Sequence, residues 1–93
     1  MQKLSEDELV KLFTKTCQQN HLKITPQRIA IYKELLKSDQ HPSVNEIYQA
    51  VKTDFHTISF DTVNRTLLTF SNIGILDIME SYGGSRRFDP KYR

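Results

Sequence analysis

The sequence predicts a mainly α-helical domain that ends in a small β-hairpin. Four stretches repeat apolar residues at helical spacing, and each follows a serine or threonine that can cap a helix N-terminus. The residues after Gly74 instead alternate in polarity on either side of a Gly-Gly pair, which is typical of two strands joined by a tight turn. A length of 93 residues, 38% of them hydrophobic and 26% charged, fits a single globular domain over residues 1–93.

The first predicted helix covers residues 6–19. Ser5 can cap its start, and three acidic residues in its first turn suit the positive end of the helix dipole. Its apolar stripe consists of Leu9, Val10, Phe13 and Cys17. Because Cys17 is the only cysteine, the sequence excludes an internal disulfide and a CxxC zinc site. We expect Cys17 to be a small core residue in a reducing compartment.

The second predicted helix covers residues 26–38. Thr25 can act as its N-cap, and Pro26 suits the first helical position, where the helix has no use for a backbone N–H. The side chains expected to face inward are Ile29, Tyr32, Leu35 and Leu36. The polar loop sequence SDQHPS ends this helix.

The third and fourth predicted helices cover residues 43–53 and 59–73. Ser43 and Glu46 have the spacing of a capping box, and Ser59 can cap the fourth helix, which ends before Gly74. The third helix has its apolar residues at Val44, Ile47, Tyr48 and Val51. With side chains about 100° apart, the fourth helix turns Val63, Thr66, Leu67 and Phe70 inward, with Phe60 at the edge, and Asp61, Arg65, Thr69 and Asn72 outward.

The chain then continues in two predicted strands, at about residues 75–81 and 85–89. Leu76, Ile78 and Glu80 alternate with residues of the other face, YGGS supplies a tight turn, and RRFD supplies the return strand before Pro90. Two short helices with a tight connection, followed by a hairpin, have the element order of a winged helix-turn-helix. Helix 59–73 would then be the reading helix, and the hairpin would be the wing.

The polar face of helix 59–73 suits DNA, because an α-helix fits the major groove. There asparagine pairs with adenine and arginine with guanine, while hydroxyl groups bind phosphates. The candidate DNA contacts of these two elements are Ser59, Thr62, Asn64 and Arg65 on the helix and Arg86 and Arg87 on the wing. Solvent contact alone also favours a polar helix face. A winged helix that binds a partner protein, without sequence-specific DNA binding, therefore stays open as the alternative.

Net charge is only +2, but the positive charge falls in two segments. Residues 21–37 hold four cations against one acid, and residues 82–93 hold four cations against one acid. If the fold brings these segments together, a nearly neutral domain can still meet a polyanion; otherwise they are two solvated basic stretches.

The residues also resemble a known family. LKITPQRIAIYKELLKSDQHPSVNEIYQAV, ISFDTVNRTLLTFSNIGIL and SRRFDP together look like the N-terminal DNA-binding domain of the ferric uptake regulator (Fur) family, over about Leu22 to Pro90. This family includes iron, zinc, manganese and peroxide sensors. The resemblance implies a cytoplasmic transcriptional regulator, in most cases a repressor, that binds operator DNA as a dimer when metal is bound.

Carried over by residue, the resemblance implies a minor-groove contact for Lys23 and a backbone contact for Arg28. Ser59 and Thr62 match phosphate-binding hydroxyls, and Arg65 matches an arginine of the family's reading helix. Two positions depart from the family: Asn64 replaces a tyrosine that packs on thymine methyls, and Asp61 replaces a small residue, in most members alanine. DNA binding is still expected, but these departures argue against the family's usual operator sequence.

The resemblance also implies two ligands of the family's sensory metal site, His41 in HP and Asp89 in RFD. The other ligands and the CxxC pairs belong to a C-terminal dimerisation and metal-sensing domain that this chain lacks. We therefore expect this chain to hold no metal tightly and to be a monomer or weak dimer, whereas a full-length member would use iron, zinc or manganese as a homodimer. The other histidines, His21 and His56, have no spacing that suggests a site.

An enzyme is not expected. Ser59, His56 and Asp61 lie close in sequence, but at a helix start serine and aspartate are explained as caps, and no oxyanion donor accompanies them. The N-terminus MQKLSEDELV has no apolar segment of the kind a signal peptide needs, and no apolar run approaches the roughly 20 residues of a membrane span. We expect a cytoplasmic location and no membrane partner.

Overall fold

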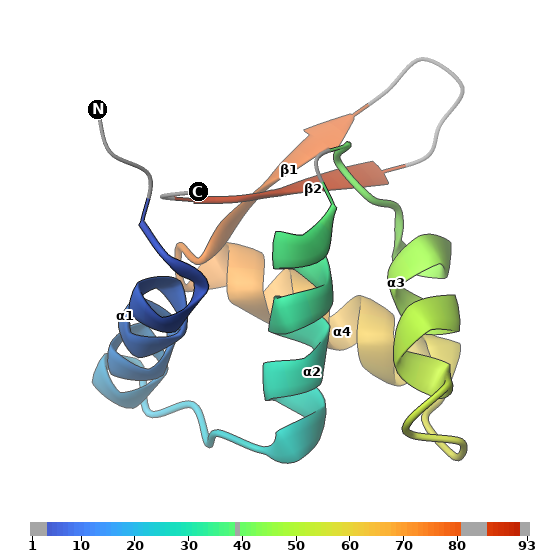
Figure 1. Cartoon of the computed structure of the whole chain (residues 1–93), viewed down its shortest axis with the longest axis horizontal. Coiled ribbons are helices and arrows are strands. Elements are labelled where there is room, and N and C mark those ends of the chain that lie inside the picture. The colour runs from blue at the N-terminus through green and yellow to red at the C-terminus, as the bar shows by residue number, and fades with distance from the viewer. Residues whose placement is uncertain (1–3, 39, 81–85, 92–93) are drawn as a thin grey trace.

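The computed structural model describes residues 4–38, 40–80 and 86–91. In order along the chain, the elements are α1 (Glu6–Gln19), α2 (Pro26–Lys37), α3 (Val44–Lys52), α4 (Phe60–Asn72), β1 (Leu76–Glu80) and β2 (Arg86–Pro90) (Figure 1). The four predicted helices and two predicted strands are confirmed, with bounds that differ by at most one residue. The predicted YGGS turn and the strand ends at residues 81 and 85 lie outside the described residues.

Each helix begins where its capping residue predicts. The Ser5 and Ser43 side chains accept hydrogen bonds from the backbone N–H of Glu8 and Glu46, at 3.2 and 3.3 Å, and both glutamates accept in return from the serine N–H at 3.1 Å. Such a reciprocal capping box satisfies two N–H groups that a helix start otherwise leaves without partners. Thr25 caps α2 and Ser59 caps α4 without a carboxylate in return.

The core lies where α1, α2 and α4 meet. The ring of Phe13 stacks on that of Tyr32 with centroids 4.4 Å apart, and meets the edge of Phe70 at 5.2 Å. Burial raises the pKa of Tyr32 to about 12, and its hydroxyl donates to the Leu9 carbonyl at 3.4 Å. Cys17 is fully buried, and burial raises the pKa of its thiol, which fits the predicted core role. Offset and edge-on aromatic contacts add stability beyond area burial.

The inward face of α2 differs from the prediction. Ile31 and Leu35 are fully buried and Tyr32 is buried, whereas Ile29 and Leu36 are only partly buried. The reason is visible in Figure 1: α2 lies between α1 and α3 with α4 behind it, so neighbours cover several of its sides. A helix covered in this way does not present the single apolar stripe on which a periodicity argument depends.

The hairpin is antiparallel and pairs Leu76 with Pro90, Ile78 with Phe88 and Glu80 with Arg86. Phe88 is fully buried, so the hairpin is fixed to the helical core rather than standing free. The return strand extends one residue further than predicted, to Pro90; a proline fits at a strand end because it cannot donate to the ladder. Gly74, at φ +83°, supplies the left-handed turn between α4 and the hairpin.

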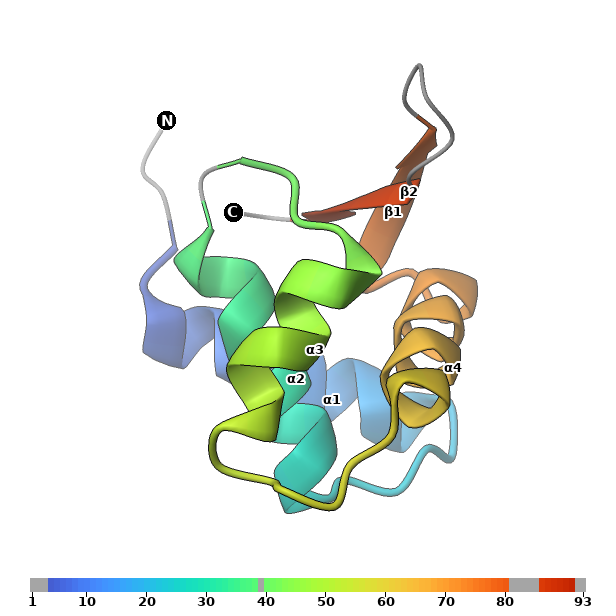
Figure 2. The same ribbon diagram turned by 90° about the vertical axis from the view of Figure 1, so that its right-hand side faces the viewer.

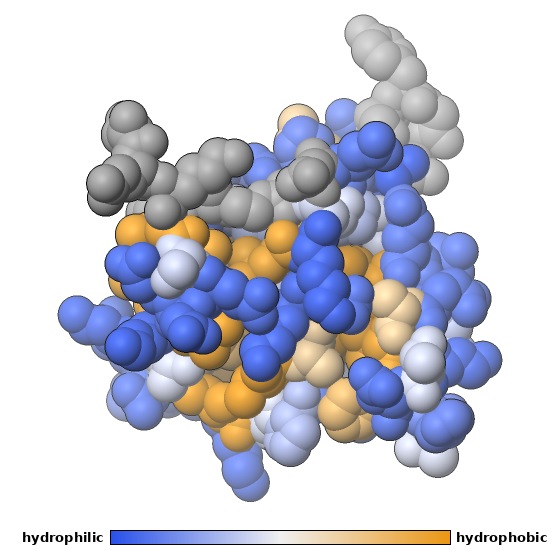
Figure 3. Space-filling view, in the orientation of Figure 1, coloured by the Kyte–Doolittle hydropathy of each residue, from blue (hydrophilic) through white to orange (hydrophobic). Residues whose placement is uncertain are grey.

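Together these elements form a winged helix-turn-helix. Figure 2 shows α3 and α4 joined by the turn below them, with the hairpin rising on the side of α4. In the orientation of Figure 1, in which α4 lies behind α2, apolar side chains reach the surface among hydrophilic ones over α1 and α2 (Figure 3). In Figure 2, α4 and the hairpin therefore share one side of the molecule.

Candidate nucleic-acid interface

The outer face of α4 is polar, as predicted. Asp61, Arg65 and Asn72 are exposed, while Thr62, Asn64 and Thr69 are half-buried. Thr66, which we expected to turn inward, is half-buried as well and belongs to this polar face, because it lines a surface pocket with Thr62, Arg65 and Thr69.

A shallow polar pocket lies between the start of α2 and this face of α4. Its volume is about 340 Å³, and its lining residues are Arg28, Thr62, Arg65, Thr66 and Thr69. Thr66 and Thr69 donate their hydroxyl protons to carbonyls one turn earlier in α4, at 2.8 and 2.9 Å, so outward they offer acceptors. The donors that a bound anion requires are therefore supplied chiefly by the guanidinium groups of Arg28 and Arg65.

Both arginines are held in place by contacts with neighbouring residues. Arg28 Nη1 donates to the Lys23 carbonyl at 2.6 Å, and Arg65 Nε lies 3.0 Å from Asp61 Oδ2. A guanidinium has five N–H donors, so each contact leaves donors for a phosphate or a base edge. The two cations come from different helices and meet at one pocket, so Arg28 places one charge of the basic segment 21–37 beside the outer face of α4.

Ser59 and Thr62 form the N-terminus of α4. The Thr62 backbone N–H donates to Ser59 Oγ at 3.0 Å, and the two hydroxyl groups are 2.8 Å apart. The position that carries a glutamate in α1 and α3 carries Thr62 here, so no capping box closes this helix start, although Asp61 lies in its first turn. Hydroxyls and N–H groups at such an end suit a phosphate oxygen.

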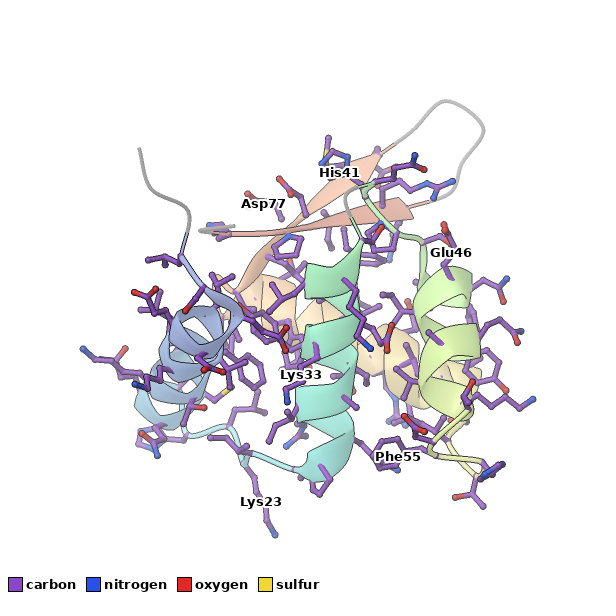
Figure 4. The ribbon with its side chains drawn as sticks, in the orientation of Figure 1. Lys23, Lys33, His41, Glu46, Phe55 and Asp77 are labelled. Atoms are coloured by element: carbon purple, nitrogen blue, oxygen red, sulfur yellow. The ribbon has the colours of Figure 1, made fainter. Side chains whose placement is uncertain are left out.

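Lys23 and the wing arginines lie further out. Lys23 is exposed in the connection before α2 and extends from the lower end of the molecule in Figure 4. Arg86 is exposed at the start of β2. Arg87 is half-buried and turned toward α3, where its Nη1 donates to Glu46 Oε1 at 2.5 Å and to the His41 carbonyl at 3.3 Å.

The link from Arg87 to Glu46 was not predicted. The bonds from Ser43, and then the Arg87 guanidinium, hold the pKa of the Glu46 carboxyl below its usual value. The two residues are 41 positions apart, so no local sequence signal could have paired them. Arg87 thus fastens the wing to the first turn of α3.

The two predicted metal ligands are neighbours. His41 Nε2 and Asp89 Oδ1 are 3.5 Å apart, both partly exposed, near the hairpin and at the opposite end from Lys23 (Figure 4). An imidazole and a carboxylate are suitable donors for zinc, iron or manganese. Within residues 4–38, 40–80 and 86–91, no three or more His, Cys, Asp or Glu residues gather as a metal site, so the fit extends to two ligands.

The residues considered for catalysis have structural explanations. Ser59 is the N-cap of α4, and Asp61 pairs with Arg65. His21 and His56 are exposed residues of the turns that follow α1 and α3. None of the helices that the structure describes has the length and apolarity required to cross a membrane.

Comparison with known proteins agrees with this geometry. The model of the ferric uptake regulator family matches residues 19–92. The peroxide-responsive repressor PerR of Staphylococcus saprophyticus is 46% identical over 70 residues, which are 75% of this chain and 47% of that protein. PerR of Staphylococcus aureus is 44% identical over 68 residues, which are 73% of this chain and 46% of that protein. The chain thus spans about half the length of these curated relatives.

Two solved structures show the same fold. The Helicobacter pylori ferric uptake regulator, described as having three functional metal binding sites, superposes with a TM-score of 0.86 at 21% identity, over 100% of this chain and 63% of that one. Streptococcus pyogenes PerR, described for peroxide sensing and gene regulation, gives a TM-score of 0.80 at 26% identity, over 96% of this chain and 59% of that one. The chain therefore belongs to the ferric uptake regulator family, whose members are transcriptional regulators and not enzymes.

Proposed function

We propose that this chain is the DNA-binding part of a metal- or peroxide-responsive regulator, a repressor, and that α4 reads operator DNA in the major groove. The observation that carries the proposal is the pocket at which Arg28 of α2 and Arg65 of α4 meet on the polar face of the reading helix. The hairpin stands on the same side of the molecule (Figure 2). A cationic pocket, a polar helix face and a wing on one side match the parts that such a duplex contact requires.

The proposed contacts divide into two kinds. Asn64 and Arg65 face base edges, where asparagine recognises adenine and arginine recognises guanine. The positioning contacts to the sugar-phosphate backbone or the minor groove come from Lys23, Arg28, Ser59, Thr62, Arg86 and Arg87. Arg87 contributes there with the donors that Glu46 and the His41 carbonyl leave free. Positioning contacts fix the register of the helix, and base contacts give the sequence preference.

In a full-length protein, a homodimer would place two such domains on the half-sites of one operator, and a divalent metal would complete the shell around His41 and Asp89. The single chain engages one half-site and loses the gain in effective concentration that a linked pair provides. We propose a cytoplasmic location for this protein, as for a regulator that must reach its DNA.

The test is a titration of the chain against fluorescent duplexes at several salt concentrations. Affinity should fall steeply with salt, with a slope of about 0.9 for each phosphate contact. Arg65→Ala should cost about 1–3 kcal/mol on the preferred site and relax the preference at one or two base pairs. An equal loss on random DNA would make Arg65 a phosphate contact.

A protein-binding winged helix is the second candidate, and Asp61 is the observation that favours it. A carboxylate that is 70% exposed on the reading helix repels phosphates but suits a partner chain. This candidate would be supported if the chain bound no duplex in a salt-dependent way and formed a salt-insensitive complex with a protein.

Metal binding is tested separately by calorimetry with zinc, manganese or iron(II). Two protein ligands leave most of the coordination shell to water, so we expect the chain to bind metal weakly. Its affinity for DNA should then not change when metal or a chelator is added. A submicromolar stoichiometric site that His41→Ala abolishes would contradict this expectation.

A further inference from the structure

Asp61 and Arg65 form an ion pair one helical turn apart on the reading helix. Asp61 Oδ2 lies 3.0 Å from Arg65 Nε, and the two side chains are 70% and 71% exposed. A pair so open to water adds little to folding stability. Its consequence must therefore be sought on the face that α4 presents outward.

The pair fixes which donors of Arg65 remain available. Asp61 engages Nε, the donor nearest the helix, while the Arg65 side chain lines the pocket that it shares with Arg28. The two terminal amino groups are left at the end of the side chain. They form the fork that matches O6 and N7 of guanine in the major groove.

The same carboxylate restricts what can lie beside Arg65. Asp61 has a second oxygen, which accepts hydrogen bonds and cannot donate them when ionised. In the major groove, aspartate can accept a hydrogen bond from the N4 amino group of cytosine. The N6 amino group of adenine lies beside the acceptor N7, which repels a carboxylate, as do the keto oxygens of guanine and thymine. Phosphate oxygens are repelled in the same way.

We propose that Asp61 is a specificity-determining residue: it holds Arg65 for guanine and selects a neighbouring base pair that presents the cytosine amino group. The inference rests on the proposed function, since it concerns the same reading helix. It also accounts for a carboxylate on a face that binds a polyanion, because the charge costs affinity for all DNA and is offset only at the correct bases.

The chain contains a matched control for this residue. Asp61 is the second residue of α4 after Ser59, and Asp7 is the second residue of α1 after Ser5, so both occupy the same helical position behind a serine cap. Asp7 is exposed as well. Asp7→Ala therefore removes the same charge and the same interaction with a helix dipole, but from α1.

The experiment is selection from a library of randomised duplexes, followed by titration of the selected and the random DNA, with the unaltered chain, Asp61→Ala, Asp61→Asn and Asp7→Ala. The unaltered chain should select a guanine with a defined cytosine beside it. Asp61→Ala should reduce the discrimination at the cytosine by about tenfold and bind random DNA more tightly. Asp61→Asn should also bind random DNA more tightly but keep part of the cytosine preference, because its amide oxygen still accepts.

Asp7→Ala should change neither the selected sequence nor the affinity, and circular dichroism should show native helix content in all variants. If Asp61→Ala and Asp61→Asn bind DNA and rank the sites as the unaltered chain does, this inference is overturned while the proposed function stands. If the unaltered chain binds no duplex in a salt-dependent way, the proposed function is overturned and this inference with it.

Discussion

The two helices of the helix-turn-helix begin alike but meet their surroundings differently. Both α3 and α4 are capped by a serine, Ser43 and Ser59. Three residues later α3 has Glu46, whose carboxylate accepts hydrogen bonds from the Ser43 N–H and from Arg87. The same position of α4 is Thr62, whose hydroxyl forms a hydrogen bond with that of Ser59. The cap of α3 is thus closed by a carboxylate of its own helix. In α4 the first-turn carboxylate, Asp61, pairs with Arg65 and not with the cap, so no capping box occupies the start of this helix.

The other two helices repeat this division. Glu8 closes a capping box at α1, whereas Arg28 occupies the corresponding position of α2. The two helix starts without a capping box are those that contribute Arg28 and Thr62 to one pocket. The residue three positions after the cap therefore separates helix ends that serve the fold from helix ends that face the proposed DNA.

The largest expected effect on DNA affinity comes from giving α4 a capping box like that of α3. Thr62→Glu should leave thermal stability unchanged or slightly higher, because it completes a capping box. It should lower DNA affinity by about tenfold or more, since it adds a second carboxylate beside Asp61 where phosphates would lie. Fluorescence titration and thermal unfolding measure the two properties. Thr62→Gln, which closes the box without charge, is the control and should lose much less affinity.

A smaller effect is expected from removing one cation. Arg28→Ala should weaken binding to all sequences by a similar factor and lower the salt slope by about one contact, and Arg86→Ala should do the same on the wing. Lys33→Ala is the control, because Lys33 extends from the face of α2 turned away from α4 (Figure 4). A loss confined to one sequence would instead assign Arg28 to base recognition.

Removing the charge of Glu46 at the N-terminus of α3 should lower folding stability and leave DNA affinity unchanged. Glu46→Gln keeps an amide that can close the box but removes the charge opposite Arg87, and exposed pairs of this kind contribute about 0.2–1 kcal/mol. The folded pKa of Glu46 lies below the ordinary 4.5. The charge therefore stabilises fully above pH 4.5, and its contribution is lost as pH falls through the lower folded pKa.

Urea unfolding of both proteins between neutral pH and pH 3 would measure the Glu46 effect. The difference should disappear at the acidic end. A constant difference would mean that packing, and not charge, explains the change.

The smallest effect is expected at α1. Hydrogen bonds from Ser5 lower the pKa of the Glu8 carboxyl and Lys11 adds a smaller effect, but no ion pair like that of Glu46 with Arg87 forms at Glu8 among the described residues. Glu8→Gln should lower the unfolding temperature by less than Glu46→Gln. An equal or larger shift would show that the link from Glu46 to the wing contributes nothing measurable.

The sequence predicted what depends on near neighbours. Caps such as Ser5 and Ser43 act over three residues, so the helix bounds could be placed within one residue. Ile31 was missed because its burial depends on helices that surround α2. Residue patterns suggested the polar face of α4, but the meeting of Arg28 with Arg65 and the bond from Arg87 to Glu46 depend on how distant segments pack. Local rules contain no information on such contacts.

The contact between the wing and the loop before α3 has a consequence for aggregation. The Phe88 N–H donates to the Pro42 carbonyl at 3.1 Å, and Ser43 forms an isolated antiparallel β-bridge with Arg87. The segment that holds Pro42 and Ser43 therefore covers the outer edge of β2. An uncovered strand edge is a template on which another chain can add a strand. The other edge of the hairpin belongs to β1, whose exposed residues include Asp77 and Glu80. Covering one edge and placing carboxylates on the other opposes edge-to-edge stacking of copies of this chain.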